Sequence, residues 1–291
     1  MRSSSRAVRR QAGKHLLGEK MRRRPTLVSK ELFKKSLCAV GLYRPLRRVR
    51  DRLLRPNEVD RANRLVTFYQ QFVSEGDLVF DIGANRGERT EAFVRLGAKV
   101  VAAEPNPYCA NLLKQIFRYC TVEVEPVAAG SQVGMLLLYR CDDDRMSSLS
   151  DEWIASVKSS RFQHLKWDLG QPVPIATLDG LIAKHGKPQF IKIDTEGFET
   201  SVLEGLTQAI QMISFEYTPE CPDLARKCLS FITKLGHYEF NLSLGENLSL
   251  ELTEWIDNDT LLKLIEQLTV ESWKSPDHMY ADIYCKHSPL R

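Results

Sequence analysis

Two stretches of this sequence share a design in which an apolar run ends in a carboxylate and then turns on glycine. The first is Val79-Phe80-Asp81-Ile82-Gly83-Ala84-Asn85-Arg86-Gly87, and the second is Ile191-Lys192-Ile193-Asp194-Thr195-Glu196-Gly197. Carboxylates in such places can accept hydrogen bonds from a ligand, remove a proton or hold a divalent cation. Glycine lets the backbone turn tightly and lets a ligand approach it closely. Both stretches are therefore candidate parts of one site.

The spacing of glycines in the first stretch separates two classes of nucleotide cofactor. A dinucleotide fingerprint has the order G-x-G-x-x-G. Counted from Gly83, it would need glycine at positions that hold Asn85 and Glu88. A pyrophosphate would come closest at Glu88, whose charge would repel it. The order present, G-x-N-x-G from Gly83 to Gly87, instead matches the G-x-G-x-G loop of methyltransferases, with Asn85 in the middle, and favours a zwitterionic methionine tail over NAD.

Two further carboxylates fit a nucleoside with an amino-acid tail. Glu104 ends the next apolar run and can accept two hydrogen bonds from a ribose diol. Since NAD enzymes use the same device, Glu104 indicates a nucleoside without choosing the class, and an NAD-dependent oxidoreductase stays as an alternative. Asp81, at the tip of its strand, can face the amino group of methionine. Loop solvation or helix capping is the structural alternative for both residues.

The second stretch supplies the candidate catalytic residues, which are Asp194, Glu196 and, at the end of the following apolar run, Glu216. One of these carboxylates could take a proton from a substrate hydroxyl, or two or three could hold Mg²⁺. Their structural alternative is helix capping and pairing with Lys192 or with arginines. Ser147 and Ser148 could hydrogen-bond a substrate if their loop folds over the donor.

The elements that must position these residues alternate along the chain. Strands are predicted over 78–82, 100–103, 121–127, 190–193, 212–217 and 281–285, and helices over 59–73, 88–96, 107–119, 177–185, 198–206, 223–235 and 257–268. Segments 238–244 and 248–252 are predicted to pair as an antiparallel hairpin, and 135–139 to be a hairpin partner outside the main repeat. The pattern predicts a doubly wound α/β domain with a mostly parallel sheet over residues 56–291.

Charge sets the first 55 residues apart from the rest. They hold 18 Lys and Arg against 3 Asp and Glu, whereas the remainder holds 23 basic and 34 acidic residues. Residues 1–55 are therefore predicted to be a basic N-terminal arm with short helices, which could contact nucleic acid or an anionic surface. No apolar run is long enough to span a bilayer. Seven scattered cysteines without a CxxC pair favour reduced thiols and a cytoplasmic protein.

Taken in order, the motifs resemble those of the FkbM family of methyltransferases. The matching stretches are 81–87, Ala103-Glu104-Pro105-Asn106-Pro107, Ser147-Ser148-Leu149, 173–179, 191–199 and Asp282-Ile283-Tyr284. The resemblance implies a class I (Rossmann-like) methyltransferase fold, S-adenosylmethionine bound by 81–87 with Glu104 and Pro105, and O-methylation of a hydroxyl on a sugar or small metabolite. The Asp/Asn-Pro-Pro-Tyr/Phe motif of N6-adenine methyltransferases is not present.

Three other functions stay open at this point. The basic arm could dock RNA or a protein as the methyl acceptor, although nucleic acid is not the expected partner. A cofactor-binding scaffold without catalysis and the NAD-dependent oxidoreductase are the others. The sequence does not identify the acceptor or the oligomeric state, and Mg²⁺ is no more than a possibility.

Overall fold

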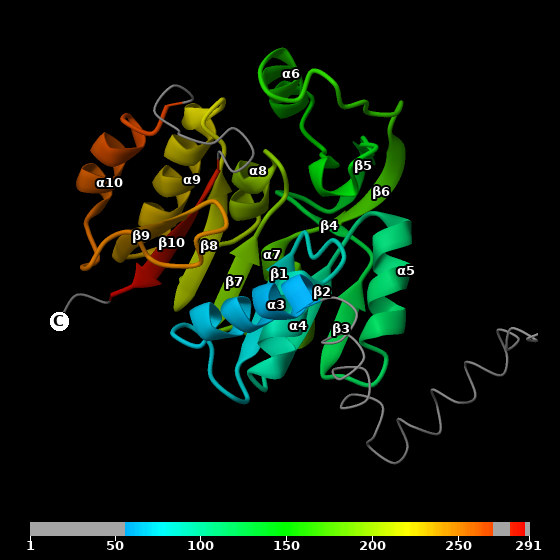
Figure 1. The fold of residues 1–291 in the computed structure, drawn as a ribbon, viewed down its shortest axis with the longest axis horizontal. Coiled ribbons are helices and arrows are strands. Elements are labelled where there is room, and N and C mark those ends of the chain that lie inside the picture. Colours follow the sequence, from blue (N-terminus) through cyan, green and yellow to red (C-terminus); the bar gives the residue numbers. More distant parts are fainter. Residues whose placement is uncertain (1–55, 270–279, 289–291) are drawn as a thin grey trace, which may run out of the picture. The chain divides into compact units, whose positions relative to one another are not determined.

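A computed structural model describes residues 56–269 and 280–288 as one α/β domain (Figure 1). Its helices are α3 (Pro56–Tyr69), α4 (Glu88–Arg95), α5 (Pro107–Ile116), α6 (Asp151–Ser159), α7 (Leu178–His185), α8 (Glu199–Glu204), α9 (Pro222–Leu235) and α10 (Asn258–Ile265), with a 3₁₀ turn at Asp144–Met146. The main strands are β1 (Leu78–Ile82), β2 (Lys99–Ala103), β3 (Val122–Glu125), β7 (Phe190–Ile193), β8 (Met212–Tyr217), β9 (Tyr238–Leu244) and β10 (Ala281–His287). The predicted basic arm lies outside the described residues.

These strands form one sheet in the order β3-β2-β1-β7-β8-β10-β9, in which β10 runs antiparallel to both of its neighbours. From β1 the chain first adds β2 and β3 on one side, and it later adds β7 and β8 on the other side. The direction in which strands are added therefore reverses between β1 and β7. In open α/β sheets, ligands bind outside the carboxyl ends of the strands at such a reversal. Doubly wound topology is thus confirmed, and it places the ends of β1 and β7 side by side.

Helices cover both faces of the sheet because side chains alternate along each buried strand. One face packs against α7, α8, α9 and α10 through an aliphatic core that includes Ile191, Val202 and Ile232. The opposite face packs against α3 and α4 through aromatic rings, among them Tyr69, Phe93 and Phe190. Near the carboxyl ends of the strands this second face becomes polar, since Asp81, Lys192 and Ser214 are aligned across β1, β7 and β8.

A second, three-stranded sheet consists of β4 (Ala128–Ala129), β6 (Gln171–Ala176) and β5 (Gly134–Leu138), in the order β4-β6-β5. Segment 135–139 does lie outside the main repeat, but it forms no hairpin with a neighbouring segment, because β5 pairs antiparallel with the distant β6. Helix α6 and strand β6 were not predicted, because they lie in or beside residues 141–171, a polar stretch without clear periodicity. Their signals were local: Ser150 caps α6 by accepting a hydrogen bond from the Trp153 amide, and β6 alternates buried and exposed residues.

The predicted hairpin between 238–244 and 248–252 is wrong. Strand β9 pairs with the C-terminal strand β10, while 248–252 forms no strand. The Asn241 side chain explains the difference, since it bonds both the amide nitrogen and the carbonyl oxygen of Leu252. These side-chain bonds replace the backbone hydrogen bonds that a hairpin between the two segments would form at Leu252. Predicted helix 59–73 also differs, beginning at Pro56, which fits a first helical turn, and ending at Tyr69.

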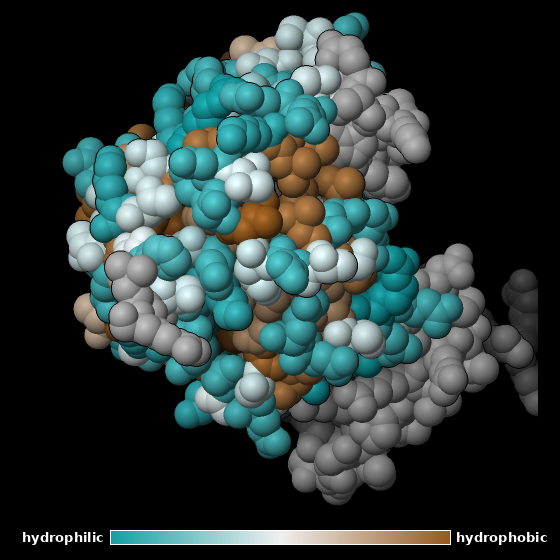
Figure 2. Space-filling view, turned by 90° about the vertical axis from the view of Figure 1, so that its left-hand side faces the viewer, coloured by the Kyte–Doolittle hydropathy of each residue, from teal (hydrophilic) through white to brown (hydrophobic). Residues whose placement is uncertain are grey.

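On the face drawn in Figure 2, hydrophilic side chains cover much of the surface and hydrophobic ones show between them. Across residues 56–269 and 280–288, every helix is too short or too polar to traverse a bilayer. The six cysteines in this part of the chain are free thiols, as the sequence predicted for them.

Candidate functional site

A cavity of about 920 Å³ opens at the carboxyl ends of β1, β2, β7 and β8. Eight of the nine predicted site residues line it: Asp81, Gly83, Asn85, Glu104, Pro105, Asp194, Glu196 and Glu216. The volume is within the range of cofactor and small-molecule sites. The fold therefore brings together predicted site residues that are up to 135 positions apart in the chain, between Asp81 and Glu216.

Gly87 is the predicted residue that does not line this cavity. Its φ is +85°, and an added Cβ would come within 2.6 Å of Leu113 and Phe117 on and after α5. The residue is therefore needed where α4 begins against α5, and it supports the loop from behind. We conclude that Gly87 shapes the loop from Gly83 to Gly87, which we call the cofactor loop after the role predicted for it, without facing the cavity.

The cofactor loop from Gly83 to Gly87 depends on left-handed backbone conformations. Gly83 has φ +81° and Asn85 has φ +46°, and asparagine tolerates that region better than most residues. A Cβ on Gly83 would overlap the carbonyl oxygen of Asp194 at the end of β7. The loop thus turns directly against the second acidic stretch, so a ligand lying on it would reach Asp194.

Glu104 is fixed in place by the backbone on both sides of it. Its two carboxylate oxygens accept hydrogen bonds of 2.7 Å from the amides of Asn85 and Asn106. Burial raises the pKa of Glu104 to about 7, against the lowering effect of those two amides. Each oxygen keeps a further lone pair for a ribose hydroxyl, so the carboxylate links the cofactor loop to β2 and can still bind a sugar.

Asp81 is buried at the end of β1 and accepts a hydrogen bond from the Thr90 hydroxyl of α4. Burial raises the pKa of Asp81, whereas Thr90 and the nearby Lys192 lower it. The side chain lines the cavity beside Gly83, which fits an ammonium group of a ligand. Together, the left-handed loop, Asp81 and Glu104 form a cradle suited to a nucleoside that carries an amino-acid tail.

The same cavity also holds Asp194, Glu196 and Glu216, which offer carboxylate oxygens within 4.8 Å of one another. Although burial would raise the pKa of Asp194, Lys192 and Arg89 outweigh it and lower that pKa to about 2. For Glu196 and Glu216, burial and the neighbouring carboxylates raise the pKa well above its ordinary value. The cluster can therefore hold an ionised carboxylate beside two carboxyl groups that retain protons. Mg²⁺ at these oxygens stays a prediction.

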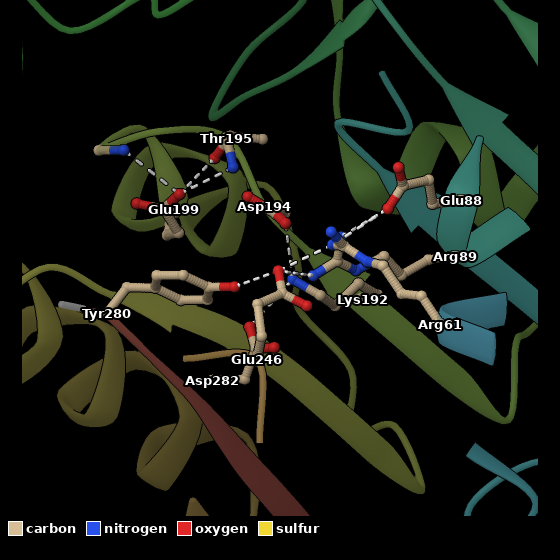
Figure 3. Close-up of polar contacts among 11 residues, drawn as sticks. Arg61, Glu88, Arg89, Lys192, Asp194, Thr195, Glu199, Glu246, Tyr280 and Asp282 are labelled. Carbon is tan, nitrogen blue, oxygen red and sulfur yellow. Dashed lines mark hydrogen bonds and ion pairs between the residues drawn. The ribbon is translucent and has the colours of Figure 1, made fainter. Parts of the chain in front are cut away.

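Lys192 explains why Asp194 stays ionised. Its side chain is 1% exposed, and its Nζ lies 3.1 Å from both Asp194 Oδ2 and Asp282 Oδ1 (Figure 3). The pairing of Asp194 with Lys192, the structural alternative considered from the sequence, does occur. It does not remove Asp194 from the cavity, which the carboxylate still lines. A lysine within the apolar run Phe190-Ile191-Lys192-Ile193 was the available signal for this buried pair.

The turn that carries Glu196 is strained and held from several sides. Glu196 has φ +53°, a left-handed backbone conformation that residues other than glycine rarely adopt. The carboxylate of Glu199 accepts hydrogen bonds from the amides of Thr195 and Gly197, at 2.9 and 3.3 Å. The hydroxyl of Ser148 donates to the Glu196 carbonyl oxygen over 2.6 Å. Glu199 and Ser148 are thus occupied in fixing the turn.

This finding corrects the expectation that Ser148 binds a substrate, because the residue is fully buried. Ser147 lines the cavity, and its hydroxyl accepts a hydrogen bond from the Cys141 amide. Helix α6 adds a further support that the sequence did not reveal. The Trp153 ring packs on Gly197, and its Nε1 donates to Thr218 Oγ1 beyond β8, over 3.2 Å. The segment after β5 thus closes one wall of the cavity.

The 3₁₀ turn reaches back over the cofactor loop. Asp144 accepts a hydrogen bond of 2.8 Å from Arg86 Nε, and its carbonyl accepts one of 3.1 Å from the Asn85 side-chain amide. Both contacts are to residues of the cofactor loop. Asp143 and Asp144 line the cavity, whereas the neighbouring Asp142 does not.

Comparisons with known proteins agree with this geometry. The model of the methyltransferase FkbM domain matches residues 81–238, which is more than half of the chain. No curated protein matches it significantly in sequence.

Similar solved structures include a precorrin-6y C5,15-methyltransferase from Geobacter metallireducens, with 12% identity, TM-score 0.40 and coverage of 77% of this chain and 87% of that one. A TehB-like SAM-dependent methyltransferase from Corynebacterium glutamicum shows 10% identity and TM-score 0.39, covering 77% and 88%. A SAM-dependent O-methyltransferase from Thermotoga maritima shows 12% identity and TM-score 0.37, with coverage of 79% of this chain and 66% of that one. Likeness at this level carries no conclusion about a substrate.

Proposed function

We propose, from the premise that this chain belongs to the FkbM family of methyltransferases and is S-adenosylmethionine-dependent, that it methylates a hydroxyl group of a sugar or another small metabolite. Family membership decides against the NAD-dependent oxidoreductase. The observation that carries the choice of acceptor is the carboxylate cluster of Asp194, Glu196 and Glu216, which shares one cavity with the cofactor loop.

In this proposal the cofactor lies with its methionine end on the loop from Gly83 to Asn85 and its ribose on Glu104. Bound S-adenosylmethionine supplies an electrophilic methyl group on sulfur. Because the Gly83 backbone abuts the end of β7, a cofactor held by this loop would lie beside Asp194. Holding the two reactants in line in a shared cavity contributes much of the rate of such a displacement.

The acceptor hydroxyl must lose its proton as the new carbon–oxygen bond forms. Asp194, ionised beside Lys192, can accept a hydrogen bond from that hydroxyl and orient it, although its low pKa makes it a weak base. Glu216 and Glu196 have raised pKa values, so each is a stronger base whenever it is ionised. We therefore assign orientation to Asp194 and proton acceptance to the glutamates. This arrangement does not depend on a metal ion.

The test uses purified full-length protein with S-adenosylmethionine labelled on its methyl group. A cell extract is separated into a small-molecule fraction and a macromolecular fraction, and each is incubated with enzyme. Label that appears in the small-molecule fraction and survives mild alkali is not a methyl ester, and NMR of the purified product then shows whether the methyl carbon is bonded to oxygen, as a methyl ether requires. Label confined to RNA or protein would instead establish the alternative of a macromolecular acceptor, and that result would overturn the proposal.

Matched variants connect this activity to the cluster. Asp194→Asn keeps the shape of the side chain but removes the charge that pairs with Lys192, and we expect methyl transfer to fall on the order of 100-fold. Asp143→Asn, in the wall of the cavity, serves as a control that removes a carboxylate outside the cluster. Equal loss in both variants, or none in Asp194→Asn, would contradict the roles assigned here. Repeating the assay with a chelator tests the predicted Mg²⁺ directly.

A further inference from the structure

Arg89, in the first turn of α4, lines the cavity but makes no hydrogen bond to the described residues. Its side chain is 20% exposed, and its Nε is enclosed without a hydrogen-bond partner. The nearest carboxylate oxygens, Glu88 Oε2 and Glu246 Oε1, lie 3.9 Å from its terminal nitrogens. That separation allows attraction between charges but is too long for a hydrogen bond.

A guanidinium carries five N–H donors in a fixed fork, so a partly buried one without hydrogen bonds is unusual. Buried polar groups are nearly always hydrogen-bonded, and leaving one without a partner is costly. The positive charge of Arg89 is balanced from a distance by Asp194, Asp282 and Glu246. Its charge is therefore compensated within the described residues, whereas its hydrogen-bonding capacity is not.

The neighbouring carboxylates do not bond to Arg89 because each has another partner. Glu246 accepts hydrogen bonds from Arg61 and from the Tyr280 hydroxyl, at 2.8 and 2.6 Å (Figure 3). Glu88 lies 3.1 Å from Arg61 as well. Asp194 and Asp282 share Lys192. The Arg89 fork is thus left available on the wall of the cavity, two residues beyond the end of the cofactor loop at Gly87.

We propose that Arg89 binds a carboxylate group that a ligand brings into this cavity. A guanidinium fork and a carboxylate form two parallel, charge-assisted hydrogen bonds, which are stronger and more selective than a single one. Two ligands could supply the group. One is the methionine end of the cofactor, whose ammonium is expected at Asp81, and the other is the methyl acceptor. The inference rests on the assignment of S-adenosylmethionine to this cavity.

The first arm of the test compares S-adenosylmethionine with its decarboxylated analogue by calorimetric titration. If the cofactor supplies the carboxylate, the wild type binds S-adenosylmethionine roughly 10- to 100-fold more tightly than the analogue. Arg89→Gln then removes that preference and leaves the affinity for the analogue unchanged. Arg95→Gln, which alters a half-buried arginine of the same helix that bonds Asn63 and does not line the cavity, keeps the preference.

The second arm uses acetate as the probe and thermal unfolding as the measurement. If the acceptor supplies the carboxylate, the wild type binds both cofactors equally, and acetate stabilises protein saturated with S-adenosylhomocysteine more than chloride does at equal ionic strength. Arg89→Gln abolishes this stabilisation, and Arg95→Gln does not. If Arg89→Gln does not fold, Arg89→Lys replaces it, since lysine keeps the charge but cannot form the paired bonds, and the preference should still weaken.

A wild type that neither prefers the carboxylated cofactor nor responds to acetate would overturn the proposal. Failure of the wild type to bind S-adenosylmethionine at all would be a different result, since it would overturn the assignment of the cofactor. In that case the acetate measurement, made on cofactor-free protein, still decides whether Arg89 binds carboxylates.

Discussion

Replacing Lys192 by methionine should destabilise the domain strongly, because it upsets a balanced set of buried charges. Lys192 and Arg89 carry two positive charges, and Asp194 and Asp282 carry two negative ones. Methionine leaves an excess negative charge beneath the cavity. Removing one member of a buried pair typically costs about 3–5 kcal/mol. Lys192 is 1% and Asp282 8% exposed, so solvent screens this pair little.

The size of the effect can be worked out for four proteins. Asp282→Asn leaves an excess positive charge and should cost about 3 kcal/mol, slightly less because Lys192 keeps Asp194. The double variant Lys192→Met/Asp282→Asn restores a net balance of charge. It should therefore be more stable than the sum of the single losses predicts, by a coupling energy of at least about 2 kcal/mol.

Urea unfolding at neutral pH measures these free energies, and thermal unfolding gives an independent check. A loss of 3–5 kcal/mol in a domain of this size corresponds to a fall in Tm of roughly 10 °C. A control, Lys184→Met, removes an exposed lysine that pairs with Glu125 and should change stability by about 1 kcal/mol or less. Additive losses in the double variant, within about 0.5 kcal/mol, would refute the proposed coupling.

Three further changes test the cofactor loop, Glu104 and the turn that carries Glu196. Gly83→Ala should abolish cofactor binding in titrations, since its Cβ would overlap the Asp194 carbonyl oxygen and its φ of +81° costs alanine about 1–2 kcal/mol; tight binding by this variant would contradict the described loop. Burial raises the folded-state pKa of Glu104 to about 7, above its unfolded value, so the cofactor-free protein should lose about 3 kcal/mol of stability as pH rises from 4.5 to 7. Glu104→Gln should remove that part of the pH dependence, and an unchanged slope in urea unfolding between pH 5 and 8 would reject it. Ser148→Ala frees the carbonyl of the strained Glu196 turn and should lower kcat about tenfold while leaving cofactor affinity unchanged, whereas a parallel loss of cofactor affinity would show that Ser148 acts elsewhere.

The parts of the fold that followed from the sequence are those with a strong local signal. Strands β1, β2, β7 and β8 are short apolar runs that end in turn residues, and their order along the chain predicts parallel pairing. Because the carboxyl ends of such strands meet at one edge, the amino-acid sequence alone sufficed to assign Asp81, Glu104 and Asp194 to one site.

What escaped prediction depends on contacts between distant residues. The local sequence around Arg89 resembles an ordinary exposed helix turn, and its burial results from packing against α3 and the loop after β9. Asp282 reaches Lys192 because the last strand inserts beside β8, which no short-range pattern encodes. The same holds for the hairpin wrongly predicted at 248–252, where the Asn241 side chain bonds the Leu252 backbone in place of a neighbouring strand.

The position of β10 has a consequence for how this domain is made. Strand β10 fits between β8 and β9, so a nascent chain in which residues 281–287 have not yet folded has a sheet with open edges at β8 and β9. Open edges can pair with other chains, which exposes the nascent protein to aggregation. Lys192 meanwhile lacks its partner Asp282. Residues 281–287 therefore both close the sheet and bring Asp282 to Lys192, so loss of this segment should be poorly tolerated.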